Sequence, residues 1–135
     1  MPLGEINFLA VGLGIVANMV LGFLWYGPVF GKYWLKIQAA RGRKTEDMEA
    51  DPFLYIQTAV LAAISHLVLA ILIARIEPAG AVAGAMWGAL IWVGVGAAGM
   101  RNNGLFEEIP AASWFLFSSY YLIIYLAFGA IYTVW

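Results

Sequence analysis

Four long apolar stretches, separated by short polar segments, dominate the hydrophobic pattern of the chain. None of them contains an Asp, Glu, Lys or Arg, and they cover residues 6–26, 52–74, 78–100 and 110–135. A transmembrane helix needs about 20 predominantly apolar residues to cross the hydrocarbon core of a bilayer. The pattern therefore predicts an all-α, polytopic integral membrane protein with four transmembrane helices in an antiparallel bundle.

The only long hydrophilic segment, residues 27–51, follows the first apolar stretch. Near its start Lys32 and Lys36 lie four residues apart, and the aromatic and aliphatic residues around them can sink into the membrane interface. This pattern predicts a short interfacial helix. Further along, the tight connection at residues 75–77 predicts an antiparallel hairpin of the second and third spans, and Asn102-Asn103-Gly104 predicts a turn before the fourth.

Composition supports a membrane protein and bounds its size. Of the 135 residues, 64% are hydrophobic and only 11% are charged, which is about half the charge of an ordinary soluble domain. The length predicts one membrane domain over residues 1–135. The net charge of −1, without a basic tract, argues against a nucleic-acid partner, and the absence of cysteine excludes disulfides and thiol catalysis.

The distribution of Lys and Arg predicts the orientation in the membrane. The loops after the first and third spans carry six of these residues, namely Lys32, Lys36, Arg41, Arg43, Lys44 and Arg101. The opposite side carries Arg75 alone. Because positively charged loops stay in the cytoplasm, we expect the 27–51 loop to be cytoplasmic and both termini to face outward.

Small residues recur every four positions in two of the spans. The first span carries Gly14 and Gly22 on one face, and the third carries Gly80, Gly84 and Gly88. Lipid is as apolar as leucine, so membrane helices associate through close approach of their backbones, which small residues permit. We interpret both faces as helix-packing surfaces within the bundle; the alternative is a self-association face between protomers.

Polar side chains are rare inside the spans and so define a candidate site. Asn18 lies in the middle of the first glycine face, His66 is the only histidine, and Tyr121 and Tyr125 are four residues apart on the last span. A strongly polar group within the membrane is costly and is a candidate for function. We interpret these side chains first as interhelical hydrogen-bonding groups, with the tyrosine hydroxyls within reach of His66 or Asn18 across the bundle; the alternative is a functional site in which they line a small polar cavity.

Several kinds of chemistry lack the residues that they need. A single histidine, without cysteine or an intramembrane carboxylate, predicts no metal site and no proton relay. No nucleophile–base pair, phosphate-binding loop or carboxylate pair can be recognised, so we predict no catalytic residues and no enzyme activity. No cofactor is predicted; the alternative is haem or a quinone bound through His66.

The first span ends in a run of aromatic residues, glycine and proline that predicts a corner at the membrane interface. Its members are Trp25, Tyr26, Gly27, Pro28, Gly31, Lys32 and Trp34. Proline disfavours helical geometry at the residue before it, and aromatic rings with a polar tip suit the headgroup level. We expect this run to stop the helix and turn the chain along the surface; the alternative is that Lys32 contacts a ligand or a lipid headgroup.

The same run resembles the signature of the domain of unknown function 1761 family of small bacterial membrane proteins. Further similar segments are Asn7-Phe8, Phe106-Glu107 and the closing Gly129-Ala130-Ile131. The chain departs from the family pattern at Phe8, where the family has tryptophan, and at Glu108, where it has glycine. The resemblance implies a four-helix protein of the bacterial cytoplasmic membrane, and it implies no activity.

Taken together, these features predict a non-enzymatic membrane protein that works by association. We expect an accessory or scaffold subunit, either a homo-oligomer or docked on a larger membrane complex. The first alternative is a small oligomeric transporter or pore built around the polar residues. The second is a membrane subunit that binds haem or a quinone through His66.

Overall fold

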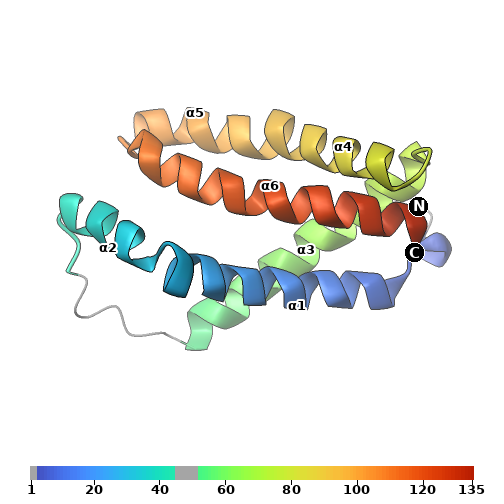
Figure 1. Ribbon diagram of the computed structural model, residues 1–135, viewed down its shortest axis with the longest axis horizontal. Helices are drawn as coiled ribbons and strands as arrows, with labels where there is room; N and C mark the ends of the chain where they lie inside the picture. The colour runs from blue at the N-terminus through green and yellow to red at the C-terminus, as the bar shows by residue number, and fades with distance from the viewer. Residues whose placement is uncertain (1–2, 45–51) are drawn as a thin grey trace.

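The computed structural model describes residues 3–44 and 52–135, and every regular element in this part of the chain is helical. After a 3-10 turn at Leu3–Glu5, the α-helices are α1 (Phe8–Leu24), α2 (Gly31–Ala40), α3 (Pro52–Ile76), α4 (Ala81–Ile91), α5 (Ala98–Phe106) and α6 (Ala111–Val134) (Figure 1). Two segments wound as π-helix, η2 (Trp25–Val29) and η3 (Trp92–Ala97), extend α1 and join α4 to α5. Residues 45–51 of the expected hydrophilic loop lie outside the described residues.

The fold prediction is confirmed by four continuous helical segments that are long and apolar enough to cross a membrane. They cover Phe8–Val29, Pro52–Ile76, Ala81–Phe106 and Ala111–Val134. Such a segment pairs its backbone N–H and C=O groups within itself, as the hydrocarbon core requires. The protein is therefore an all-helical, multi-pass membrane protein.

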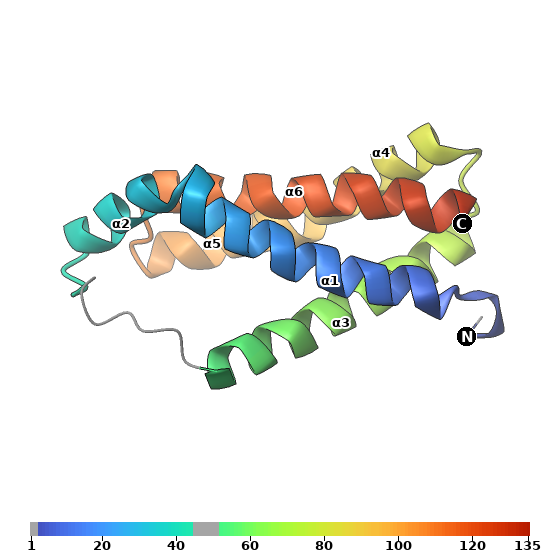
Figure 2. The ribbon, with the colours of Figure 1, turned by 60° about the horizontal axis from the view of Figure 1, so that its bottom comes forward.

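Helix α6 is the centre of the bundle. It packs along α4 over most of its length and also contacts α1, α3 and η3. The chain direction alternates, so that α6 runs antiparallel to α4 and to α1, while α3 crosses the bundle obliquely (Figures 1 and 2). The main hydrophobic core joins α3 to α6 and is formed by Leu69, Ile73, Tyr120, Ile124 and Phe128.

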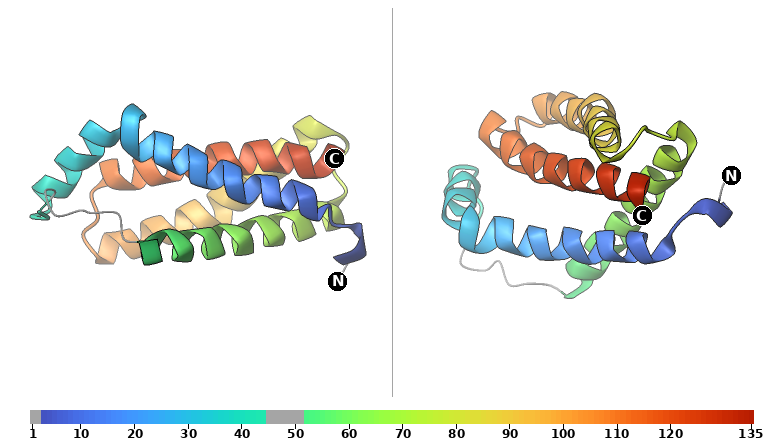
Figure 3. Two further views of the ribbon diagram at one scale, coloured as in Figure 1. Left: turned by 90° about the horizontal axis from the view of Figure 1, so that it is seen from below. Right: turned by 45° about the vertical axis from the view of Figure 1, so that its right-hand side comes forward.

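At one end of the bundle a side chain links the first and the last spanning helices. There the Asn7 side chain caps α1 by accepting hydrogen bonds from the backbone N–H groups of Leu9 and Ala10. The same side chain donates from Nδ2 to the backbone carbonyl of Trp135 at 3.1 Å. The start of α1 and the end of α6 therefore lie side by side (Figure 3).

The chain bends within the expected corner run, at Phe30, but the expectation that the helix stops at Pro28 is wrong, because the helix continues through the proline. Proline has no N–H to donate, and the chain accommodates this by one widened turn in which the Phe30 N–H donates to the Trp25 carbonyl at 2.9 Å. The spanning segment continues to Val29, and the expected short helix follows as α2, bent away from α1 (Figure 3).

The predicted turn at Asn102-Asn103-Gly104 is also wrong, because all three residues belong to α5. The chain turns later, where Glu108 adopts a positive φ of 54° and Pro110 precedes the first residue of α6. Two side chains fasten this connection to α5: Arg101 donates to the Ile109 carbonyl at 3.1 Å, and Asn103 donates to the Glu107 carboxylate at 3.3 Å. Asn103 thus contributes a side-chain hydrogen bond to this connection, while its backbone remains helical.

Candidate functional site

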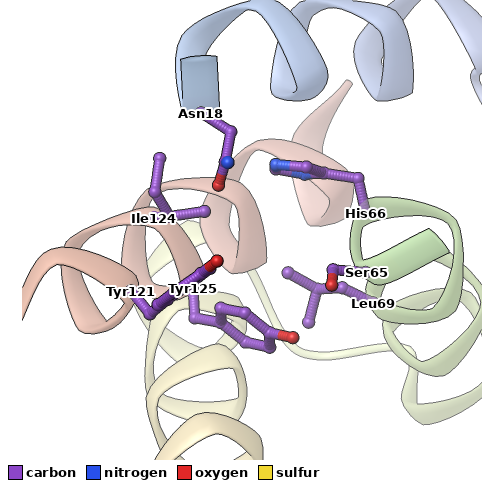
Figure 4. Close-up of a pocket in the computed structure, with 7 residues that line it drawn as sticks. All are labelled: Asn18, Ser65, His66, Leu69, Tyr121, Ile124 and Tyr125. Atoms are coloured by element: carbon purple, nitrogen blue, oxygen red, sulfur yellow. The ribbon is translucent and has the colours of Figure 1, made fainter. Parts of the chain in front are cut away.

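Three helices bring polar side chains together inside the bundle. A pocket between α1, α3 and α6 is lined by Asn18, Ser65, His66, Leu69, Tyr121, Ile124 and Tyr125 (Figure 4). All four residues of the predicted polar site are among them, and Ser65 joins them because it precedes His66 on the same helix. The pocket is closed in this conformation, since no water-sized sphere fits inside it.

His66 is the most completely enclosed of the polar groups in this pocket. Its side chain is only 2% exposed, and its ring meets the Phe128 ring edge-on with centroids 4.7 Å apart. Gly14 makes room for this ring, because a Cβ atom at Gly14 would collide with the imidazole of His66 and with the hydroxyl of Tyr132. The first glycine face therefore serves to seat a histidine from the neighbouring helix.

The two ring nitrogens of His66 have different surroundings. Nδ1 lies 2.7 Å from the Tyr132 hydroxyl, whereas Nε2 is buried and has no hydrogen-bond partner among the described residues. Nδ1 is also the one partner that the described residues provide for the Tyr132 hydroxyl. We assign the tautomer in which Tyr132 donates to Nδ1 and the imidazole proton lies on Nε2, because it gives the phenol proton an acceptor. The pocket consequently presents an unpaired N–H donor.

Asn18 and the tyrosines of α6 are held by a second set of contacts. The Tyr120 hydroxyl donates to the Asn18 backbone carbonyl at 2.7 Å, and Gly22 leaves space for that phenol. The Asn18 side chain is directed into the pocket from α1 (Figure 4) and only 3% of the residue is exposed. On the other side the Tyr121 ring stacks on Trp92, with centroids 4.9 Å apart.

Sequence reasoning missed Tyr132 and Trp92, although each carried a signal. Tyr132 follows Tyr125 by seven residues, two helical turns along the same face. Trp92 lies in the middle of its span, away from the interface where tryptophan is usually found. Its indole N–H donates to the Ser118 carbonyl at 3.0 Å, which fixes η3 against α6.

The second glycine face lies between α4 and α6, inside one protomer. A Cβ atom at Gly84 would meet the Gly129 carbonyl, and one at Gly88 would meet the Tyr125 carbonyl. Gly129, which the sequence analysis named for the family resemblance and not for helix packing, supplies the matching gap on α6. A Cβ atom at Gly80 would meet nothing within 4 Å, and the residue instead has a positive φ of 90° before α4 begins, so its role is conformational.

The aromatic run around Pro28 packs onto the start of α6. The Trp25 indole N–H donates to the Leu116 carbonyl at 3.0 Å, and its ring lies 4.6 Å from that of Phe30. Tyr26 packs against Trp34 and Phe117. The remaining members of the run have simpler environments: Gly31 is buried against the Tyr26 carbonyl, Gly27 has no close neighbour, and Lys32 is exposed.

The same geometry bears on the binding of a metal ion or of haem. Among the described residues, no group of three or more His, Asp or Glu side chains is placed to hold a metal ion. The space around Nε2 of His66 is narrower than a water molecule and is bounded by three packed helices, so a ligand of this nitrogen requires the surrounding side chains to move.

The comparisons with known proteins give a family and no activity. A model of a family described as "Protein of unknown function (DUF1761)" matches residues 9–133. No curated protein and no solved structure matches the chain. The family model covers nearly all of the sequence, including all but the outermost residue of the first and of the last membrane-spanning segment, so the chain belongs to the DUF1761 family of proteins of unknown function.

Proposed function

We propose that the protein is a non-enzymatic, accessory membrane protein that holds a carbonyl-bearing ligand of the bilayer in the pocket between α1, α3 and α6. The observation that carries the proposal is the unpaired Nε2 of His66. A buried donor without an acceptor costs about 1–3 kcal/mol. A carbonyl oxygen is the acceptor that recovers this cost within lipid, where water is scarce.

The rest of the pocket supports a neutral, hydrogen-bonding ligand. Asn18, Ser65 and the two tyrosines provide amide and hydroxyl groups, while Leu69 and Ile124 provide apolar walls. Among the residues that line the pocket there is no carboxylate, lysine or arginine to bind a charged group. Apolar walls with a few convergent polar groups are typical of small-molecule sites. A quinone, with carbonyl oxygens on an apolar ring, has this chemistry.

Access to the pocket requires a change of side-chain conformation. The hydroxyl-bearing rings of Tyr121 and Tyr125 project from α6 into the space facing α3 (Figure 4). Both rings are only partly buried, and we propose that their rotation opens the pocket. The ligand then reaches Nε2 from the side of α3 that carries Ser65.

The other functions expected from the sequence receive less support. A pore needs a wet path, and this pocket does not admit a water-sized sphere. Self-association through the glycine faces needs those faces to be free, whereas Gly84 and Gly88 contact α6 of the same chain. Docking on a larger membrane complex is compatible with ligand holding and is the sense in which we call the protein accessory.

We also propose the location and orientation that the charges predict. The membrane is the cytoplasmic membrane of a bacterium, with the 27–51 loop in the cytoplasm and both termini outside. The clustering of Lys and Arg at the end of the bundle that carries α2 supports this orientation. The pairing of Asn7 with Trp135 supports placing both termini on one side.

The proposal is tested with purified full-length protein and a short-tailed benzoquinone as the probe. Wild-type protein is expected to bind the probe and to lower the frequency of one of its carbonyl stretching bands, as a hydrogen bond does. His66→Phe keeps the ring shape but removes the donor, so the band shift is expected to disappear and affinity to fall about tenfold. Native mass spectrometry of the same samples reports the bound mass and the oligomeric state.

Two further variants keep this test falsifiable. His66→Phe leaves the Tyr132 hydroxyl unpaired, so His66→Phe with Tyr132→Phe removes both polar groups and is the better folded non-binding variant. Tyr55→Phe removes an exposed hydroxyl at the start of α3, outside the pocket, and is expected to bind like wild type. Equal binding by wild type and the double variant would overturn the proposal.

A further inference from the structure

A second hollow lies at the end of the bundle that carries α2, between α2 and the start of α6. It is an open groove of about 470 Å³ lined by Phe30, Tyr33, Ala112, Phe115, Leu116 and Ser119. This volume is within the usual range of small-molecule sites, about 300–1,000 Å³. None of these residues lines the polar pocket, so the groove is a separate site.

The walls of the groove are largely apolar. Phe115 is 63% exposed, and Tyr33 is also exposed. The Ser119 hydroxyl already donates to the Phe115 carbonyl at 2.7 Å, which leaves little polarity on the α6 side. An exposed apolar hollow in a membrane is filled by hydrocarbon, because its walls offer water no hydrogen-bond partners.

The rim of the groove is positively charged. Lys36 follows Tyr33 by three residues and therefore lies on the same side of α2. Lys32 precedes Tyr33 on the adjoining flank, and both lysines are exposed. Long lysine side chains extend along apolar surface to place their ammonium groups at the headgroup level. A phosphate at the mouth of the groove would lie within their reach.

The level of the groove in the membrane fits this arrangement. Helix α2 begins directly after the last turn of the first spanning segment, and α6 begins at Ala111, next to the groove residue Ala112. Both walls therefore stand where a spanning segment meets the interface. Aromatic side chains such as Phe30 and Tyr33 are favoured at this level.

We propose that this groove binds one anionic phospholipid, with an acyl chain between α2 and α6 and the phosphate on Lys36 and Lys32. The apolar walls account for the chain, and the two lysines account for the charge. Each lysine near the membrane surface contributes about 1 kcal/mol to the binding of anionic lipid, so its removal is expected to lower the affinity about fivefold. The α2 segment thereby becomes a lipid-dependent part of the fold.

The test compares two lipids on the full-length protein. Protein is released from nanodiscs of phosphatidylglycerol or phosphatidylcholine, and native mass spectrometry counts the lipids that stay bound. Wild type is expected to retain one phosphatidylglycerol in preference to phosphatidylcholine. Lys36→Gln is expected to reduce this preference about fivefold, and the double variant with Lys32→Gln to abolish it. Arg43→Gln, which removes a charge beyond the end of α2, is the matched control and is expected to behave like wild type.

Filling the groove separates acyl-chain binding from charge. Ala112→Trp and Ser119→Phe each place a ring in the hollow and are expected to abolish retention of both lipids, while circular dichroism stays unchanged. Retention that survives both substitutions would overturn the proposal. Equal retention of the two lipids, insensitive to Lys36→Gln but lost on filling, would also overturn it, because the occupant would then be a neutral lipid.

Discussion

At the scale of single residues, three glycines set how closely α4 and α6 approach. Gly84 and Gly88 on α4 meet Gly129 on α6, and the space that a side chain would occupy is taken by backbone carbonyls. A carbonyl in a helix cannot rotate away as a flexible side chain can. The α4–α6 contact therefore depends on these positions remaining glycine.

Gly88→Ala is expected to destabilise the protein by about 1–3 kcal/mol, because its methyl group collides with the Tyr125 carbonyl and forces the helices apart. The measurement is the free energy of unfolding in mixed micelles. Gly94→Ala is the matched control, since a Cβ atom there meets nothing within 4 Å. If both variants were equally stable, the close α4–α6 contact would be refuted.

Residue identity alone could predict the polar pocket in part. Asn18, His66, Tyr121 and Tyr125 were recognisable because each is polar within an apolar span. Gly129 and Trp92 were not, because their roles depend on which helix crosses which and at what height. The hydrogen-bond partner of His66 could not be chosen from several hydroxyl-bearing residues until the helices were placed.

At the scale of helices, two widened turns adjust the spans to their neighbours. Both η2 and η3 begin with a tryptophan, and in each case its indole N–H donates to a carbonyl of α6. A third bond runs the other way, from Trp114 on α6 to the Ala97 carbonyl at 3.0 Å. A buried indole requires such a partner, so these bonds connect the irregular turns to the regular helix.

Trp92→Phe is expected to lower the melting temperature measurably, through a loss of about 1–3 kcal/mol from the indole hydrogen bond and the stacking on Tyr121. Thermal unfolding in detergent, followed by circular dichroism, provides the measurement. Trp87→Phe is the matched control, because Trp87 lies on the same helical segment but is 40% exposed. Equal melting temperatures would show that the indole bond contributes nothing.

The helices themselves were predictable, but their irregular turns were not. Long uncharged runs determine the spans because no other structure hides so much apolar surface. Pro28 was expected to end the first helix, since the usual effect of proline is to remove a hydrogen bond. The widened turn at Trp25–Val29 restores one bond to the Trp25 carbonyl, and the packing of Trp25 and Tyr26 on α6 favours continuing the helix.

At the scale of the whole molecule, the even number of spans is consistent with the start of α1 and the end of α6 lying at the same end of the bundle. Four described segments cross the bundle in alternating directions, so the first begins and the last ends at the same end. The connection of α3 to α4, at Glu77–Gly80, lies at that end as well, whereas α2 lies at the opposite one (Figure 1). The orientation proposed from the charges therefore places these two ends on opposite sides of the membrane, and a single labelling experiment can test both.

Single-cysteine labelling is expected to place the two ends on opposite sides of the membrane. The chain has no cysteine of its own, so Arg43→Cys and Glu77→Cys each provide one reactive thiol. A membrane-impermeant maleimide added to intact cells is expected to label position 77 and not position 43, with both labelled after lysis. The reverse pattern would place the 27–51 loop outside and contradict the proposed orientation.

The bond between Asn7 and Trp135 has a consequence for protein engineering. Because the Asn7 amide reaches the carbonyl of residue 135 at 3.1 Å, a short peptide is enough to join the two positions. The chain is thus suited to circular permutation, with new ends opened at the exposed Ala79–Gly80 connection. Such a rearranged gene product would keep every interhelical contact while reversing which hairpin emerges from the ribosome first.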